Sequence, residues 1–351
     1  MRGSVVKAVT RTYDPDRLVD LVSAVFEAAG ASLPTARTVA GLLVSAERMG
    51  HPSHGVLRVP DYVARVDAGK LDPAAEPVVV REMATSALVD ARWGFGQLGA
   101  MAATDWAVDH AGSGVAVAGA HNLNHIGRLG DFTEAAARHG MVAIAMVGGT
   151  PSGATGNVAP HGGREPIWGT NPIAIAIPGL DRIFSLDFAT SVIAGGKAKA
   201  ALARGEMLDD QYLIDTYGRP TNDPSAIDAG GAIRPFGGHK GYGLAFAIEL
   251  LAGALVGTTA PDLAYGSMHN GYLVIVIDPA TFGDAGRFGS AVEELIDRVK
   301  ATAPASGFEE VMYPGEPEQR RMAAATGVEV PESVIETLNG LATRFGLQSD
   351  W

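Results

Sequence analysis

Apolar residues recur at helical spacing through the first quarter of the chain. Residues 15–49 carry this pattern with one interruption between Gly30 and Pro34, and the pattern resumes near Ser53 and continues to about Ala68. Glycine and proline are the residues that most often end or restart a helix. The sequence therefore predicts a small helical unit in the first quarter of the chain.

Apolar runs of strand length follow this unit. They are separated by helical or glycine-rich stretches and occupy residues 86–89, 114–118, 141–147, 172–177 and 272–277. Further helices are expected over residues 194–203, 241–256, 291–301 and 332–345. The pattern predicts an α/β protein with a mixed sheet. We expect a helical domain over residues 1–78, with residues 317–351 packed on it, and a sheet domain over residues 79–316 with inserted helices over about 194–260.

Composition narrows the class of protein. The 351 residues are 47% hydrophobic and 19% charged, which is an ordinary globular balance with enough apolar material for a sizeable core. The formal net charge of -12 opposes nucleic acid or an anionic membrane as partner, because both need a basic surface. The chain has no cysteine, no apolar stretch near the roughly 20 residues of a membrane span and no signal-peptide core. We expect a soluble, cytoplasmic protein.

A Ser-His-Gly sequence at residues 53–55 is the first candidate for chemistry. If Ser53 caps a new helix, His54 lies at its positive end and Arg58 lies one turn further along the same face. A guanidinium can bind a carboxylate while an imidazole moves a proton at a neighbouring oxygen. The alternative is a helix start with an exposed histidine and a solvated arginine.

Two histidines, His121 and His125, follow the strand expected at residues 114–118. Zinc ligation by this pair is one interpretation, but Gly127 and Gly130 indicate a loop rather than the helix that such a motif needs. A buried structural histidine and a catalytic one both remain open. The glycine-rich stretch 148–169 is long for a loop inside a compact domain, and loops of that length are often functional.

Two later segments could bind an anion. Thr190 and Ser191 precede a Gly-Gly pair at an expected helix start, with Lys197 and Lys199 nearby, and a second glycine-rich start carries His239 and Lys240. Either segment could equally serve close packing. No G-x-G-x-x-G fingerprint, no G-x-x-x-x-G-K-[ST] P-loop and no G-x-S-x-G elbow is present, so an ordinary Rossmann unit and a P-loop nucleotide site are not supported, and an esterase is less favoured.

Six ordered blocks resemble the type 2 malate/L-lactate dehydrogenase family. They are SHGVLRVPDYV, HNLNHIG, WGTNPIAIAIP, DFATSVIAGGK, PFGGHKGYGLAFAIELLAGAL and YPGEPEQ, and the likeness runs from about Val19 to Gly346. The family includes ureidoglycolate and sulfolactate dehydrogenases, diketogulonate reductase and piperideine-2-carboxylate reductase. The resemblance implies a non-Rossmann α/β fold, usually a homodimer, that binds NAD or NADP and transfers hydride reversibly between the nicotinamide and a 2-oxo or 2-hydroxy acid.

The resemblance also implies roles for particular residues. His54 matches the acid/base group at the substrate oxygen, with Ser53 beside it and Arg58 on the carboxylate, while His125 matches a second active-site histidine that some members use instead. The expected cofactor-binding residues are Asp187, Thr190, Ser191, Lys240, Gly241, Pro314, Gly315 and Glu316. His51 and Pro52 depart from the acidic or small residue that many members have before the Ser-His, which leaves the substrate open.

Three other interpretations stay in view. The nearest is reduction of a cyclic imine such as piperideine-2-carboxylate. A metal-dependent hydrolase or lyase using His121, His125 and an aspartate belongs to another class, and a non-catalytic protein that keeps the fold and binds NADH is a third.

Overall fold

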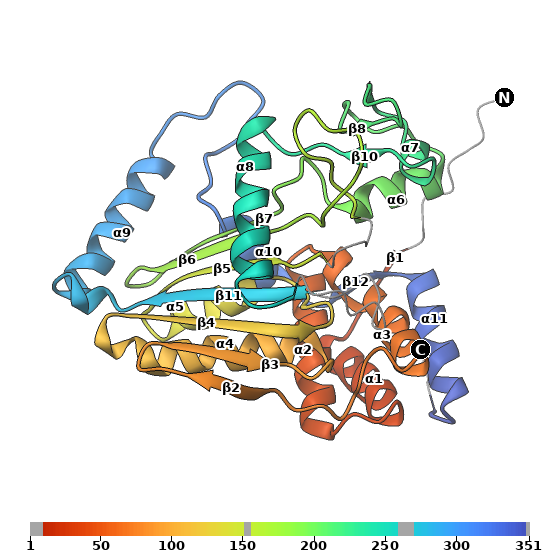
Figure 1. Ribbon diagram of the computed structural model, residues 1–351, viewed down its shortest axis with the longest axis horizontal. Coiled ribbons are helices and arrows are strands. Elements are labelled where there is room, and N and C mark those ends of the chain that lie inside the picture. The colour runs from red at the N-terminus through yellow and green to blue at the C-terminus, as the bar shows by residue number, and fades with distance from the viewer. Residues whose placement is uncertain (1–9, 151–155, 259–269, 349–351) are drawn as a thin grey trace.

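The computed structural model describes residues 10–150, 156–258 and 270–348. A helical unit, a large mixed sheet and a small glycine-rich lobe make up the molecule (Figure 1). The helical unit lies at one end of the sheet, and the lobe lies above it in the view of the figure.

The helical unit is built from both ends of the chain. Helices α1 (Pro15–Ala28), α2 (Leu33–Arg48) and α3 (Val59–Asp67) pack with the late helix α11 (Glu332–Arg344), and strand β1 (Thr10–Tyr13) pairs antiparallel with β12 (Val328–Pro331). Asp14 and Ser32 cap α1 and α2 by accepting backbone hydrogen bonds. Val25, Leu43 and Leu338 are among the fully buried side chains of the shared core.

The sheet has seven strands in the order β2-β3-β4-β11-β5-β6-β7. Only β3 and β4 run parallel; every other neighbouring pair is antiparallel. The strands are β2 (Val78–Glu82), β3 (Ser86–Asp90), β4 (Val115–Leu123), β5 (Val142–Gly148), β6 (Ile173–Pro178), β7 (Ile183–Phe188) and β11 (Asn270–Ile277).

Helices cover the two faces of the sheet unequally. Helices α4 (Gly96–His110) and α5 (Gly130–Arg138) pack on one face, where strand positions are mostly alanine and admit a helix closely. The other face carries α8 (His239–Ile248), which continues as a π-helix over Glu249–Ala254. Helix α9 (Ala285–Lys300) packs near β6 at the far end, and α10 (Glu316–Ala324) leads back to the helical unit.

The small lobe holds the three-stranded sheet β10-β8-β9, formed by Ala232–Ile233, Leu213–Ile214 and Pro220–Thr221. Helices α6 (Gly195–Arg204) and α7 (Ser225–Asp228) complete it. Short 3-10 turns occur at Pro52–His54, Val56–Arg58, Ala111–Ser113 and Pro279–Thr281. Within the described ranges, no helix is both long and apolar enough to span a membrane.

The structure corrects three local predictions. Ser53 does not cap a helix: it lies in the turn Pro52–His54, and α3 begins only at Val59, where Pro60 favours a helix start. The strand expected to stop at Ala118 continues to Leu123, so His121 lies on a strand. Thr190 and Ser191, which the sequence placed at a helix start, lie before α6, which begins at Gly195 in agreement with the helix predicted over residues 194–203.

Candidate active site

Two histidines from distant parts of the chain meet where the helical unit joins the sheet. His54 lies in the turn after α2, and His125 lies just beyond the end of β4. His54 Nδ1 is 3.3 Å from His125 Nε2, and the rings are nearly parallel with centroids 5.3 Å apart. The structure thus brings together the two histidines that the sequence proposed as alternative acid/base groups.

A buried polar chain continues behind His125. The hydroxyl of Tyr62 on α3 lies 2.8 Å from His125 Nδ1, and Gln97 Nε2 at the start of α4 donates to that hydroxyl at 2.9 Å. Both side chains are almost completely buried. Sequence reasoning missed both residues, because Tyr62 has the spacing of a core position and Gln97 is separated from the other members along the chain.

Burial keeps both imidazoles neutral. Burial, with Arg58 as the next contributor, lowers the pKa of His54 to about 4. The pKa of His125 lies well below its ordinary value because that ring is buried and faces His54 and Arg58. An anion placed beside Arg58 would oppose these effects and make His54 easier to protonate.

Arg58 is held beside the histidine turn. Its Nε donates to the carbonyl of Ser53 at 2.7 Å, and its Nη1 donates to Asp61 at 3.1 Å. Ser53 therefore contributes its backbone to the placement of the arginine. The guanidinium is partly exposed, so its orientation is fixed while it stays accessible to a carboxylate.

Glu47 on α2 holds the turn from the other side. Its Oε1 accepts a hydrogen bond from the backbone of Val56 at 3.0 Å. Gly55 lies so close that a Cβ there would be 2.2 Å from the same oxygen. Burial raises the pKa of Glu47 to about 7, although the Val56 hydrogen bond opposes this. The close approach explains why glycine follows His54.

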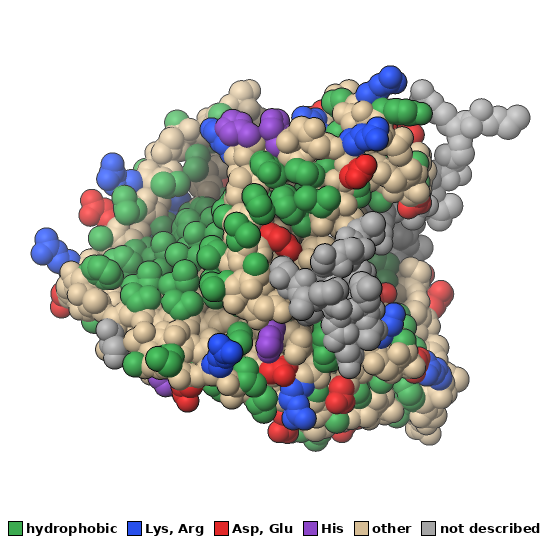
Figure 2. Space-filling view, in the orientation of Figure 1, with side chains coloured by type: hydrophobic (Ala, Val, Ile, Leu, Met, Phe, Trp, Pro, Cys, Tyr) green, Lys and Arg blue, Asp and Glu red, His purple; other side chains and the backbone are tan. Residues whose placement is uncertain are grey.

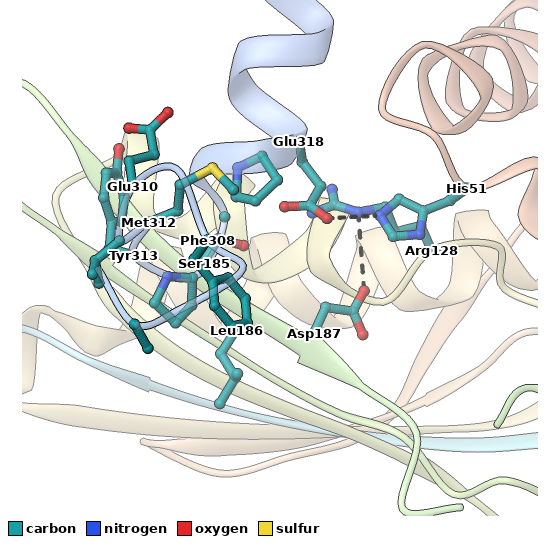
Figure 3. Close-up of a pocket in the computed structure, with 15 residues that line it drawn as sticks. His51, Arg128, Ser185, Leu186, Asp187, Phe308, Glu310, Met312, Tyr313 and Glu318 are labelled. Carbon is teal, nitrogen blue, oxygen red and sulfur yellow. Dashed lines mark ion pairs between the residues drawn. The ribbon is translucent and has the colours of Figure 1, made fainter. Parts of the chain in front are cut away.

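A cavity of about 610 Å³ opens next to this turn (Figure 3). Of the residues expected to bind the cofactor, Asp187, Pro314 and Gly315 line it, together with His51, Arg128, Ser185, Leu186, Ala305, Phe308, Glu310, Val311, Met312, Tyr313, Pro317 and Glu318. His51 Nε2 lies 3.5 Å from a carboxylate oxygen of Glu318. The cavity falls within the size range of cofactor and small-molecule sites.

Glu316 lies behind this lining and supports it. It is buried, it accepts hydrogen bonds from Lys300 and Arg320, and it also accepts one from the backbone of Tyr313 at 3.2 Å. Burial would raise the pKa of Glu316, but these partners hold it below its ordinary value. Glu316 therefore fixes the turn that carries Pro314 and Gly315.

Arg128 forms a buried ion cluster on the cavity wall. Its side chain is only 3% exposed; Nη1 pairs with Asp131 at 2.8 Å, Nη2 with Glu134 at 2.5 Å, and Nε lies 4.0 Å from Asp187. Asp187 in turn accepts a hydrogen bond from Gly130 at 2.7 Å, at the start of α5. Sequence reasoning missed Arg128, because most of its environment is supplied by the fold.

The remaining expected cofactor residues lie where the lobe meets the start of α8. The hydroxyl of Thr190 donates to two backbone carbonyls and that of Ser191 donates to the carbonyl of Ile193, so neither hydroxyl hydrogen is free. Lys240 is exposed in the first turn of α8. Gly241 packs so tightly that a Cβ would be 2.2 Å from the carbonyl oxygen of Phe236. The backbone of Phe236 also donates to Thr190, which joins the two segments.

The lobe also reaches the histidine turn. A Cβ built at Gly196, in the first turn of α6, would lie 3.6 Å from Ser53 Cβ. His121, in contrast, contacts residues outside this site: its Nε2 lies 4.0 Å from a carboxylate oxygen of Asp90. Across the described part of the chain, no group of three or more histidines and acidic residues is placed to hold a metal ion.

Comparison with known proteins shows the relationship directly. The family model for malate/L-lactate dehydrogenase matches residues 13–339. The chain is 36% identical to an L-sulfolactate dehydrogenase of Methanocaldococcus jannaschii, over 95% of this chain and 97% of the relative. It is 37% identical to a Δ1-pyrroline-2-carboxylate/Δ1-piperideine-2-carboxylate reductase of Pseudomonas putida, over 92% of this chain and 95% of the relative.

Solved structures agree. The sulfolactate dehydrogenase structure from Methanocaldococcus jannaschii superposes with a TM-score of 0.87 at 34% identity, covering 96% of this chain and 98% of that one. The absence of a Rossmann fingerprint is explained by this separate fold. The chain belongs to the malate/L-lactate dehydrogenase family and is an NAD(P)-dependent oxidoreductase of the 2-hydroxy acid type.

Proposed function

We propose that the His54–His125 pair is the proton-transfer group of this dehydrogenase and that Arg58 binds the carboxylate of a 2-oxo or 2-hydroxy acid. The observation that carries the proposal is the contact between the two imidazoles beside a fixed, accessible guanidinium. The Nδ1 atom of His54 is engaged by His125, which leaves Nε2 for the substrate oxygen. When bound, the nicotinamide supplies or accepts the hydride at the substrate carbon.

A bound substrate would change the pKa of His54. Burial and, after it, the positive charge of Arg58 depress the pKa of His54. A substrate carboxylate on Arg58 would cancel part of that positive charge and raise the pKa of His54 toward neutrality. Binding would thereby turn His54 into an effective acid for reduction of an oxo group, and its neutral form would serve as the base for oxidation of a hydroxyl.

The cavity beside His51 fits part of a dinucleotide. Asp187, Pro314 and Gly315 would hold the cofactor there, with Lys240 and Gly241 contributing from the start of α8 and Thr190, Ser191 and Glu316 supporting their backbones. Both NAD and NADP are candidates. A cytoplasmic location accords with a chain in which no cysteine requires an oxidising compartment.

We further infer that the protein is a homodimer that uses the open face of the large sheet. Apolar side chains are contiguous over that face beside α8 (Figure 2). Phe246, Leu250 and Leu251 are exposed along α8 and its π-helical continuation, and Leu255 is exposed just beyond it. Exposed apolar patches of this kind usually mark an interface. Light scattering should give twice the chain mass, and Leu255→Glu should shift it toward the monomer; a monomeric wild-type protein would refute the inference.

The decisive assay follows NADH and, separately, NADPH absorbance with purified protein. The panel comprises pyruvate, oxaloacetate, sulfopyruvate, diketogulonate and piperideine-2-carboxylate. Turnover of an oxo acid supports the proposal. Turnover of the imine alone favours the second candidate function, imine reduction, which the 37% identity to the reductase of Pseudomonas putida supports. Tight NADH binding without turnover of any acid or imine would favour a non-catalytic role.

A further inference from the structure

Resting on the proposed function, we propose that Tyr62 and Gln97 are positioning residues that fix the tautomers of the two histidines. Through the hydrogen-bond series Gln97–Tyr62–His125, neutral His54 presents an N–H group, rather than a lone pair, to the substrate oxygen. Both residues are buried behind His125, so each acts through His125.

The direction of the hydrogen bonds in this series follows from Gln97, at the end furthest from His54. Gln97 Nε2 can only donate, and it donates to the Tyr62 hydroxyl oxygen. The tyrosine hydrogen is therefore directed to His125 Nδ1, 2.8 Å away. Neutral His125 must then carry its hydrogen on Nε2 and donate to His54 Nδ1 at 3.3 Å. The remaining hydrogen of neutral His54 lies on Nε2.

Burial protects these hydrogen bonds from competition by water. Tyr62 is 1% exposed and Gln97 is fully buried, so water does not compete for their hydrogen bonds. Burial also raises the pKa of Tyr62, which keeps its hydrogen in place as the donor. The charged and titratable groups that act on the two imidazoles are Arg58, His51 and Arg128. None of these three can replace the neutral donor behind His125.

With this tautomer, His54 is arranged to donate a hydrogen bond to a carbonyl oxygen. The N–H on His54 donates a hydrogen bond to the lone pairs of an oxo group, as a 2-oxo acid presents, and so orients it. The proton that the reduction consumes is a further one, which the pair takes up from solvent once the substrate carboxylate raises the pKa of His54. Oxidation of a hydroxyl needs a lone pair on His54 instead, so every hydrogen bond in the chain must reverse. Gln97 permits this reversal by turning its amide, because its buried Oε1 has no partner within the described residues and could accept from Tyr62.

Replacement of Tyr62 by phenylalanine tests the role. The tyrosine stabilises the neutral histidine pair, and a hydrogen bond to a neutral base lowers that base's pKa. In Tyr62→Phe the midpoint of the pH profile of kcat/KM should therefore rise by about 0.4–1 pH unit. Gln97→Met should move it in the same direction. A residue that served packing alone would lower activity without moving the midpoint.

Tyr272→Phe is the matched control. Tyr272 is equally buried and its hydroxyl also forms a buried hydrogen bond, to Thr104 at 2.7 Å, but it lies on β11 away from the histidine pair. Its removal should leave the midpoint at the wild-type value. A Tyr62→Phe midpoint that coincides with those of the wild type and Tyr272→Phe would overturn the proposal.

A second readout does not depend on turnover. Nitrogen-15 spectra of histidine-labelled protein report which ring nitrogen carries hydrogen, and His54→Asn and His125→Asn assign the two signals. Wild-type His125 should be protonated at Nε2, and Tyr62→Phe should convert it to a tautomer mixture. Protonation of wild-type His125 at Nδ1 would refute the inference even if oxo-acid turnover upholds the proposed function. If no acid is turned over, this spectrum still decides the matter.

Discussion

Replacing Arg128 by methionine should destabilise the protein strongly. The substitution keeps much of the apolar volume but leaves Asp131, Glu134 and Asp187 without the guanidinium that lies among them. Removing one partner of a buried ion pair costs about 3–5 kcal/mol. An unfolding entropy of about 2.1 cal/mol/K per residue gives roughly 0.7 kcal/mol/K for 351 residues, so the melting temperature should fall by about 4–7 °C.

The loss of stability in Arg128→Met should depend on pH, and the pKa values of the three carboxyls give the direction of that dependence. Burial raises the pKa of Asp131 to about 6 and that of Asp187 above its ordinary value, whereas hydrogen bonds from Arg128 and Ser185 hold that of Glu134 low despite its burial. Without Arg128 all three pKa values rise, and the carboxyls can be neutralised by protons as the pH falls. The deficit of Arg128→Met relative to wild type should therefore be smaller at pH 5 than at pH 7.5.

Calorimetric or fluorescence-detected melting at the two pH values measures the deficit. Arg138→Met is the matched control, because Arg138 lies 3.5 Å from the same Glu134 but is 60% exposed, and exposed pairs contribute little. It should melt within about 1 °C of the wild type. Equal deficits for the two variants, or a deficit for Arg128→Met that grows on acidification, would refute the reasoning.

Three further results are expected. Arg58→Lys should raise KM for the acid about 10–100-fold, since a single ammonium replaces the paired N–H donors of the guanidinium. NADH affinity measured by fluorescence should stay constant, and its loss would contradict the assignment. Because the folded pKa of His54 lies at about 4, below the unfolded value near 6.5, its contribution to stability is present above pH 6.5 and is lost toward pH 4. His54→Asn should therefore melt with a weaker acid dependence and show no turnover; unchanged acid dependence or retained turnover would count against this role. Gly55→Ala should lower kcat at least about tenfold by pushing its Cβ against Glu47, and adding Glu47→Ala should restore part of the loss; no recovery would exclude that contact as the cause.

Periodicity predicted the elements well where local pattern decides them. The Gly30–Pro34 break separates α1 from α2 as expected, and the apolar runs became strands of the large sheet. The prediction around Ser53 was wrong because helical spacing was carried across Pro60. Proline belongs in the first turn of a helix, and that signal was available in the sequence.

The site could be predicted only in part. His54 and His125 were named, but their contact joins residues 71 positions apart and depends on how the helical unit packs against the sheet. Tyr62, Gln97 and Arg128 give no local signal, because a buried polar residue has a role only once its partners are known.

Construction of the helical core from both chain ends bears on biosynthesis. About 250 residues separate Leu71 from Val328, and both belong to that core. At about 5–20 residues per second, a ribosome needs roughly 12–50 s to make this stretch. During that time the N-terminal helices have no C-terminal partner and keep apolar surface uncovered. We expect the large sheet to mature first and the turn that carries His54 to gain its final position only near the end of translation.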